Sequence, residues 1–269
     1  MKKIIALFLA ALMLTACFAG CSKPATNPDS TEGAPATDSA YIAKNKKIVV
    51  GITDYAPMDY KDENGEWTGF DAEFAEAFAA ELGVKCEFYV ISDWGKKFME
   101  LETKQIDAVW NGMTITEEAT SNSSVSNPYV INAQVVVMKA DAVANYADAA
   151  SLAGLTIAVE SGSAGEEAAN AIANATIVPL QDQAAALMEV AAGTSDACVI
   201  DITMANAMTG EGTSYADLTY NLSLTSEEYG VSFRKDSDLT AKFNDFMAKL
   251  MADGTLDALA EKYTLTLVK

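Results

Sequence analysis

The sequence predicts a mixed α/β protein built from two lobes with a cleft between them. Three observations support this prediction. About 230 residues follow a leader-like segment, which is enough for two lobes rather than one core. Strand-like and helix-like runs alternate in both halves of these residues, as in sheets with parallel neighbours and helices on their faces. Finally, a short sequence pattern recurs at a fixed offset of 89 residues.

The recurring pattern consists of "MELETKQIDA" (Met99–Ala108) and "MEVAAGTSDA" (Met188–Ala197). The two segments share Met-Glu, the next aliphatic residue and Asp-Ala. A match of this length can arise by chance. If it is real, both lobes contain the same helix–turn–strand unit.

The first 21 residues are expected to be an export signal that does not belong to the fold. Lys2 and Lys3 precede an apolar stretch at 4–14, which is short for a membrane span. Small residues and a cysteine follow twice, in "LTAC" and "FAGC". Either Cys17 or Cys21 therefore resembles the lipid acceptor of bacterial lipoproteins, and an ordinary cleavable signal is the alternative.

A tether is predicted over residues 22–42. Its first part, "SKPATNPDSTEGAPATDS", is rich in Pro, Ser, Thr, Ala and Asp and has too little apolar surface to fold. A lipid anchor followed by a tether implies a soluble domain that is held at the outer face of the cytoplasmic membrane.

Composition excludes several classes of function. The formal net charge of −20 becomes about −22 when Lys2 and Lys3 leave with the signal, so nucleic acid is excluded as a partner. The acid excess indicates either a solubilising surface or a preference for cationic ligands. The chain has no histidine, so we expect no metal site, no cofactor and no Cys/His nucleophile. Cys86 and Cys198 lie in different halves and are expected to be two buried thiols, although a disulfide is the alternative.

The first half alternates strands and helices. Phe70, Phe74 and Phe78 recur every four residues, which indicates a helix that Gly83 ends. The other elements expected here are, in order, a strand at 47–53, an Asn-Gly hairpin at 62–67, a strand at 84–90, a helix at 96–103 and a strand at 106–110.

The second half repeats this alternation, and we expect strands at 155–160, near 177 and at 197–201, with helices at 165–173 and 183–192. Two further segments, 134–139 and 228–235, are interpreted as crossings between the lobes. Lobe 1 is then 43–133 with 228–269, and lobe 2 is 134–227. The C-terminal residues form two helices that pack on lobe 1.

A polar elbow, "NGMT" (Asn111–Thr114), ends the apolar strand at 106–110. The offset of 89 residues places Gly112 at the position that Asp201 has in the second half. In open α/β sheets, ligands bind beyond the carboxyl ends of the strands. The elbow and Asp201 are therefore expected to form opposite walls of the cleft.

Four segments together resemble one known family: "VGITDYAPMDYKDENGEWTGFDAEFAEAFAAELGV", "IDAVWNGMTIT", "DLTYNLSLTSEEYGVSFRK" and "ADGTLDALAEKY". They are similar to the family 3 solute-binding proteins of bacterial ABC importers over about residues 45 to 265. The resemblance implies a two-lobed periplasmic-binding-protein-like fold (type II), hinged by two crossings. It also implies a non-enzymatic, monomeric protein that binds an amino acid or a related small amine and delivers it to the transmembrane subunits of an ABC permease.

The resemblance also implies which residues contact the ligand. Tyr55 would stack on the ligand with Asp54 beside it, Trp94 would form the opposite wall, and Asp201 would pair with the ligand's ammonium group. Glu160 would face the ligand. The α-amino and α-carboxylate groups would be held by two segments, the elbow (Asn111, Gly112, Met113 and Thr114) and a turn at a helix start (Gly162, Ser163 and Ala164).

One departure from the family concerns the ligand's carboxylate. Where the family has an arginine that binds it, this chain has Ala119, and its single arginine, Arg234, lies in the return crossing. Ala164 also removes a hydroxyl from the turn. An arginine–carboxylate contact contributes about 1.5–3 kcal/mol. Without it, the carboxylate would rest on backbone dipoles, or the ligand has none.

The remaining acids and aromatic residues favour a ligand that is cationic or zwitterionic. Asp201, Glu160 and Asp54 supply the negative charge, and Tyr55, Trp94 and Trp110 supply aromatic faces for cation–π attraction. The alternatives are that Trp94 and Trp110 belong to the core and that Glu160 is a solvated strand end.

Two rival functions share this scaffold. A cyclohexadienyl dehydratase-like enzyme would use Glu160 or Asp201 as its acid or base, but no histidine, metal set or serine triad accompanies them. A sensor input domain would need a transmembrane helix and a signalling module after Lys269.

Overall fold

The computed structural model describes residues 37–269. The predicted signal, Cys17, Cys21 and the tether up to residue 36 lie outside the described residues. The predicted end of the tether is wrong, because helix α1 (Asp38–Asn45) occupies that part of the chain. Thr37 caps this helix, Ile42 of the helix is buried, and Asp38 forms an ion pair with Arg234. Residues 38–42 therefore belong to the folded part of the protein and not to a tether.

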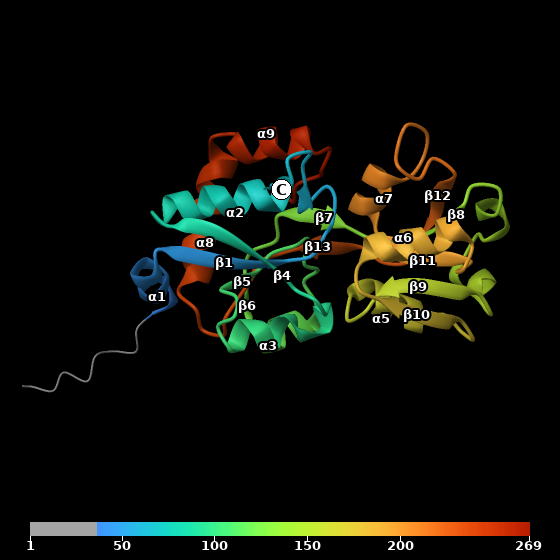
Figure 1. Ribbon diagram of the computed structural model, residues 1–269, viewed down its shortest axis with the longest axis horizontal. Helices are drawn as coiled ribbons and strands as arrows, with labels where there is room; N and C mark the ends of the chain where they lie inside the picture. The colour runs from blue at the N-terminus through green and yellow to red at the C-terminus, as the bar shows by residue number, and fades with distance from the viewer. Residues whose placement is uncertain (1–36) are drawn as a thin grey trace, which may run out of the picture. The chain divides into compact units, whose positions relative to one another are not determined.

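The first lobe contains a five-stranded sheet in the order β4-β1-β5-β14-β6. Strands β4, β1 and β5 are parallel, and β14 is antiparallel to both of its neighbours. Helices α2 and α3 lie on opposite sides of β1 and β4 (Figure 1). The strand bounds are β1 Lys47–Ile52, β4 Lys85–Val90, β5 Ala108–Val109, β6 Ser124–Val125 and β14 Ser232–Phe233. The other elements are the hairpin β2 (Tyr60–Lys61) and β3 (Trp67–Thr68), α2 (Phe70–Glu81), the 3-10 turn η1 (Trp94–Lys96), α3 (Lys97–Glu102), α4 (Glu117–Asn122), α8 (Leu239–Ala252) and α9 (Thr255–Lys262).

Aromatic side chains of α2 and α8 pack around Trp110 in the core of the first lobe. The Trp110 ring lies edge-on to Phe243, with 4.8 Å between centroids, and edge-on to Phe74, at 5.1 Å. Trp110 is fully buried, so it belongs to the core and supplies no aromatic face to the cleft. The four-residue spacing that predicted α2 therefore corresponds to three buried aromatic side chains on one face of the helix, Phe70, Phe74 and Phe78.

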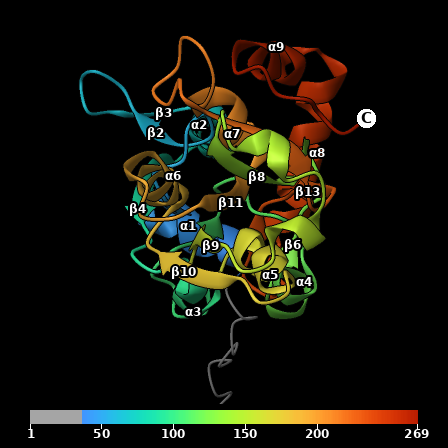
Figure 2. The ribbon, with the colours of Figure 1, turned by 90° about the vertical axis from the view of Figure 1, so that its right-hand side faces the viewer.

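The second lobe repeats this arrangement in a sheet of order β10-β9-β11-β8-β12. Strands β10, β9 and β11 are parallel, whereas β8 and β12 are antiparallel additions. Figure 2 views the molecule from this lobe. The strand bounds are β8 Gln134–Lys139, β9 Thr156–Glu160, β10 Thr176–Leu180, β11 Ala197–Asp201 and β12 Leu218–Ser223. The helices are α5 (Ala164–Asn170), α6 (Gln183–Ala192) and α7 (Ile202–Met208), with 3-10 turns η2 (Val143–Asn145) and η3 (Ala149–Leu152).

The two lobes are joined by an antiparallel strand pair, β7 (Val130–Asn132) and β13 (Glu227–Tyr229). The predicted crossing at 134–139 is wrong, because this segment is β8 and lies inside the second sheet. Its first five residues are all buried, as is typical of a strand covered on both faces. Part of the predicted return crossing, Ser232–Phe233, is likewise strand β14 of the first sheet.

The 89-residue repeat corresponds to a repeated structure. The Asp107 carboxylate accepts a hydrogen bond from the Val49 amide at 2.9 Å, and the Asp196 carboxylate accepts one from the Thr156 amide at 2.8 Å. In each lobe this aspartate precedes the middle strand of the sheet and contacts the strand beside it. The two matching segments therefore occupy equivalent places in the two lobes, and β5 and β11 are equivalent strands.

Cys86 and Cys198 are free, which confirms the prediction of two thiols. Cys198 is buried and Cys86 is half-buried, and burial raises the pKa of the Cys86 thiol to about 12. Within residues 37–269, no helix has the length and apolar character needed to span a membrane.

Candidate ligand-binding site

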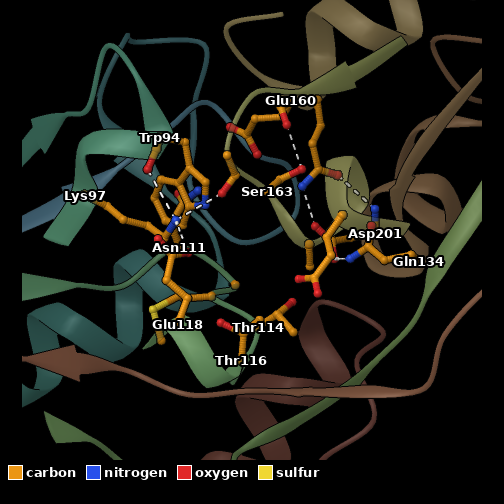
Figure 3. A pocket seen from close by; sticks show the side chains of 16 residues that line it. Trp94, Lys97, Asn111, Thr114, Thr116, Glu118, Gln134, Glu160, Ser163 and Asp201 are labelled. Atoms are coloured by element: carbon orange, nitrogen blue, oxygen red, sulfur yellow. Dashed lines mark hydrogen bonds and ion pairs between the residues drawn. The ribbon is translucent and has the colours of Figure 1, made fainter. Parts of the chain in front are cut away.

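A pocket lies between the two lobes, at the carboxyl ends of β5, β9 and β11, and it encloses a cavity of about 50 Å³. Figure 3 shows side chains from both lobes pointing into it. Ten of the twelve residues that the resemblance placed at the ligand line this pocket: Trp94, Asn111, Gly112, Met113, Thr114, Glu160, Gly162, Ser163, Ala164 and Asp201. The other lining residues are Lys97, Thr116, Glu118, Gln134, Glu167 and Gln183.

Asp201 is a buried carboxylate that is held by amide side chains. Its Oδ1 accepts hydrogen bonds from Gln134 Nε2, at 2.7 Å, and from Asn132 Nδ2, and its Oδ2 accepts one from Gln183 Nε2. Burial raises the pKa of Asp201 to about 6, although these donors oppose the shift. A carboxylate has about four acceptor sites, so the three amides leave one for a ligand N–H.

Glu160 is a second buried acid, at the end of β9. Its side chain is almost inaccessible, which excludes the alternative of a solvated strand end. Among the described residues, its Oε1 atom has no hydrogen-bond partner. Burial, followed by the charge of Asp201, raises the pKa of Glu160 to about 8. This carboxyl group can therefore pair with a ligand cation or, when protonated, donate a hydrogen bond to a ligand oxygen.

The elbow forms a wall of the pocket, and several of its polar groups are bonded to the first lobe and the hinge. Asn111 accepts from the Thr53 amide at 2.9 Å and donates to the Thr53 hydroxyl at 2.7 Å. The Gly112 amide donates to Asp71 at 2.6 Å, and the Thr114 hydroxyl donates to Glu227 at 3.0 Å. These bonds fix the shape of the wall.

The turn before α5 also bonds mainly to itself. The Gly162 amide donates to Glu166 Oε2 at 2.7 Å. The Ser163 hydroxyl donates to the Glu160 carbonyl at 2.7 Å and accepts from the Glu166 amide at 3.1 Å, as expected of a helix N-cap. Gly162 has a φ of +73°, and a Cβ built on it would lie 2.5 Å from the Gly95 Cα, so the turn packs directly against the first lobe.

Lys97 is a pocket residue that the sequence analysis missed. It is the first residue of α3, and its side chain is 6% exposed. Its ammonium group donates to the Gly162 carbonyl of the other lobe at 3.1 Å and to the Trp94 carbonyl at 3.4 Å (Figure 3). One signal was available in the sequence: Lys97 lies four residues before buried Leu101 and so shares its helix face.

Gln134 and Gln183 are also pocket residues that sequence reasoning missed. Both lie at the start of a regular element, β8 and α6 respectively, where a polar residue is ordinary. Their importance comes from their bonds to Asp201, which depend on the packing of β8, α6 and β11.

The structure does not bring Tyr55 and Asp54 into the pocket. The Tyr55 ring is buried behind Gly112, where a Cβ would lie 2.6 Å from it, and its hydroxyl bonds to Thr203 and Tyr229. Tyr55 therefore has no free face on which a ligand of this pocket can stack. Asp54 is exposed at the surface.

Arg234 is also outside the pocket and has a structural role. It is buried, pairs with Asp107 at 2.9 Å and with Asp38 at 3.0 Å, and donates to the Ile106 carbonyl. Ala119 is fully buried in α4. None of the described residues that line the pocket is an arginine.

The two sheets have equivalent strand ends, a strand pair joins them, and a pocket lies between the lobes, which together define a two-lobed solute-binding protein. The chain belongs to the bacterial extracellular solute-binding proteins, family 3, whose model matches residues 48–266.

Characterised relatives cover most of the chain. It is 30% identical to the lysine/arginine/ornithine-binding periplasmic protein of Escherichia coli (strain K12), over 84% of this chain and 90% of the relative. It is also 30% identical to an arginine-binding extracellular protein of Bacillus subtilis (strain 168), over 98% of both chains.

Solved structures agree with the fold. Holo ArgBP from T. maritima matches with a TM-score of 0.74 and 31% identity, covering 83% of this chain and 98% of that one. An ancestral amino acid-binding protein, described as a precursor of cyclohexadienyl dehydratase, matches with a TM-score of 0.77 and 33% identity over 84% of this chain and 98% of that one.

Proposed function

We propose that this protein is the substrate-binding component of an ABC importer and that it binds an amino acid of net positive charge. Asp201 carries this proposal. Its carboxylate is buried and oriented by three amide donors, and it has no lysine or arginine partner among residues 37–269. A ligand ammonium group would supply the missing positive charge.

The charge of the pocket supports the preference for a cationic ligand. Its lining includes one basic residue, Lys97, and four acids, which are Glu118, Glu160, Glu167 and Asp201. Two of the relatives point the same way, since one is a lysine/arginine/ornithine-binding protein and the other an arginine-binding protein. Glu160 is the acid best placed to receive the ligand's second positive charge, because its buried Oε1 has no partner within the described part of the chain.

Trp94 would supply the apolar wall for the ligand. It lines the pocket and is 6% exposed, so one part of the ring contacts the core and another part faces the cavity. An indole face attracts cations as well as alkyl chains. This suits a basic amino acid with an aliphatic stem.

The proposal includes location and partners. The protein would be exported and lipid-anchored through Cys17 or Cys21. A tether that ends before α1 would hold the folded domain at the outer face of the cytoplasmic membrane. It would act as a monomer that delivers its ligand to the transmembrane subunits of a permease. Ligand contacts to both lobes would stabilise the closed state.

A dehydratase-like enzyme is the second candidate, because one matched structure is a dehydratase precursor and Glu160 is a buried acid with a raised pKa. Such an enzyme would consume a prephenate-like substrate. We favour binding without catalysis, and the absence of product after incubation with prephenate is the expected result. Formation of an aromatic product would support the enzyme instead.

Differential scanning fluorimetry of the mature domain against amino acids and amines tests the proposal. A ligand at 100 times its Kd stabilises the fold by about 2.7 kcal/mol, which raises the midpoint measurably. We expect the largest shifts from arginine, lysine or ornithine. The largest shift from glutamate or aspartate would contradict the proposed preference.

A further inference from the structure

None of the described residues that line the pocket is an arginine. Arg234, the single arginine of the sequence, is bonded to Asp38 and Asp107 elsewhere. If the ligand is an amino acid, as proposed above, another group must neutralise its carboxylate, because a buried charge without a partner is costly.

Several of the hydrogen-bond donors that the sequence indicated for this purpose are already engaged. The Gly112 amide bonds to Asp71, the Thr114 hydroxyl to Glu227, and the Gly162 amide to Glu166. The Ser163 hydroxyl donates to the Glu160 carbonyl. Using any of these donors for the ligand would cost an existing bond.

Lys97 has the position and charge that the carboxylate requires. Its ammonium group lines the pocket, next to the Gly162 turn and Trp94, and contacts both lobes. An ammonium group has three N–H donors, and two hydrogen bonds to carbonyls leave one. A carbonyl also carries no net charge, so these bonds do not neutralise the lysine.

The neighbouring acids leave this charge incompletely paired. Glu118 is 3.8 Å away, at the outer limit for an ion pair, and its side chain is 58% exposed. Burial lowers the pKa of Lys97, which shows that the surroundings disfavour its charged form. Lys96 provides the contrast: it is exposed and paired with Asp93 at 2.7 Å.

We propose that Lys97 is the residue that binds the ligand's carboxylate in this protein and that it thereby selects amino acids over the corresponding amines. Lys97 and Asp201 reach the pocket from different lobes (Figure 3). A zwitterion would join them, so that the carboxylate contact on one lobe and the ammonium contact on the other both favour closure. Decarboxylated ligands would keep the ammonium contact to Asp201 and lose the carboxylate contact to Lys97.

Matched pairs of ligands test this inference: arginine with agmatine, lysine with cadaverine, ornithine with putrescine and histidine with histamine. Each amine lacks the carboxylate of its partner. Isothermal titration calorimetry would be performed on the wild type, Lys97→Met, Lys97→Arg and the control Lys96→Met, with the thermal midpoint of each variant recorded. The pair whose amino acid binds the wild type most tightly is decisive.

We expect the wild type and Lys96→Met to prefer the amino acid to its amine by at least about tenfold. Lys97→Met should weaken the amino acid by about 10- to 100-fold and leave the amine within about threefold, whereas Lys97→Arg should keep most of the preference. If Lys97→Met weakens the binding of the amino acid and of the amine equally, Lys97 acts by linking the two lobes and the inference is overturned. If Lys97→Met weakens the binding of neither ligand, the inference is also overturned. A wild type that binds no amino acid of the four pairs would overturn the proposed function first, and the inference with it.

Discussion

Tyr55 in the first lobe and Thr203 in the second share a hydrogen bond between their hydroxyl groups, and Tyr229 of the hinge strand bonds to both. All three residues are buried. The triad joins the lobes behind the pocket, so Tyr55 contributes to closure where the family resemblance implied stacking on the ligand.

Tyr55→Phe should shift the protein toward the open state, because it removes the interlobe bond and keeps the ring. A buried hydrogen bond of this kind contributes about 0.5–1.5 kcal/mol, so ligand affinity should fall about 2- to 12-fold. Small-angle scattering of the ligand-free variant should give a larger radius of gyration. Wild-type scattering and wild-type ligand affinity in this variant would show that the hydrogen bond between Tyr55 and Thr203 does not hold the lobes together.

Gly162→Ala should prevent full closure. Its Cβ would lie 2.5 Å from the Gly95 Cα and 2.7 Å from the Gly95 amide nitrogen, which belong to the facing lobe. We expect at least a tenfold loss of ligand affinity, as measured by calorimetry, and little unfolding, because the lobes can separate to relieve the clash.

Gly154→Ala is the control for backbone strain. Gly154 lies in the same lobe with a φ of +85°, and a Cβ there has no neighbour within 4 Å. It should lose a similar amount of stability and keep its affinity. Equal affinities of the two variants would show that the contact between Gly162 and Gly95 is not needed for binding.

Glu160 should make the ligand-free protein less stable as the pH rises. Its pKa of about 8 in the fold exceeds its ordinary value of 4.5, so the unfolded chain releases the proton first. The free energy of unfolding therefore falls between pH about 5 and 8 and levels off above that range. Asp71 and Asp201, with pKa values of about 7 and 6, act in the same direction.

Urea unfolding at several pH values measures this effect. Glu160→Gln should flatten the pH dependence of stability, whereas Glu167→Gln, which changes an exposed acid of the same pocket, should leave it unchanged. An unaltered slope in Glu160→Gln would mean that Glu160 is already ionised in the ligand-free fold.

Arg234→Met should destabilise the protein without changing ligand affinity. The substitution leaves Asp107 buried without its cation, and breaking a buried ion pair in this way costs about 3–5 kcal/mol. Lys235→Met, at the exposed neighbouring position, should cost less than about 1 kcal/mol. Chemical denaturation and calorimetry on both variants check the two expectations. A selective loss of ligand affinity in Arg234→Met would assign the arginine to binding instead.

The elements that the sequence predicted best carry strong local signals. Helix α6 and strand β11 have the predicted bounds, since Asp182 caps the helix and Gly193 ends it in a left-handed conformation. By contrast, β5 is shorter than predicted, because pairing in the sheet extends over Ala108–Val109 alone. Pairing depends on neighbouring strands and cannot be read from the strand's own sequence.

The pocket was predictable where a residue ends a buried strand. Glu160, Asp201 and the elbow follow apolar runs, and the structure places all of them in the pocket. Lys97 was missed because the adjacent Lys96 is chemically identical. Which of the two lysines faces the pocket depends on how the short helix α3 is rotated about its axis. Tyr55 lies outside the pocket, and its bond to Thr203, which spans 148 positions and both lobes, could not be read from the sequence.

The affinity of Asp201→Ala for the best-binding amino acid tests the central claim most directly. Asp141→Asn, an exposed acid of the same lobe, is the control. Removing the carboxylate leaves the ligand's ammonium group buried against three amides that were oriented to a negative charge, so calorimetry should show a loss of affinity of at least about 100-fold. If Asp201→Ala holds the ligand as tightly as the wild type, Asp201 does not receive the ammonium group and the proposed mode of binding is wrong.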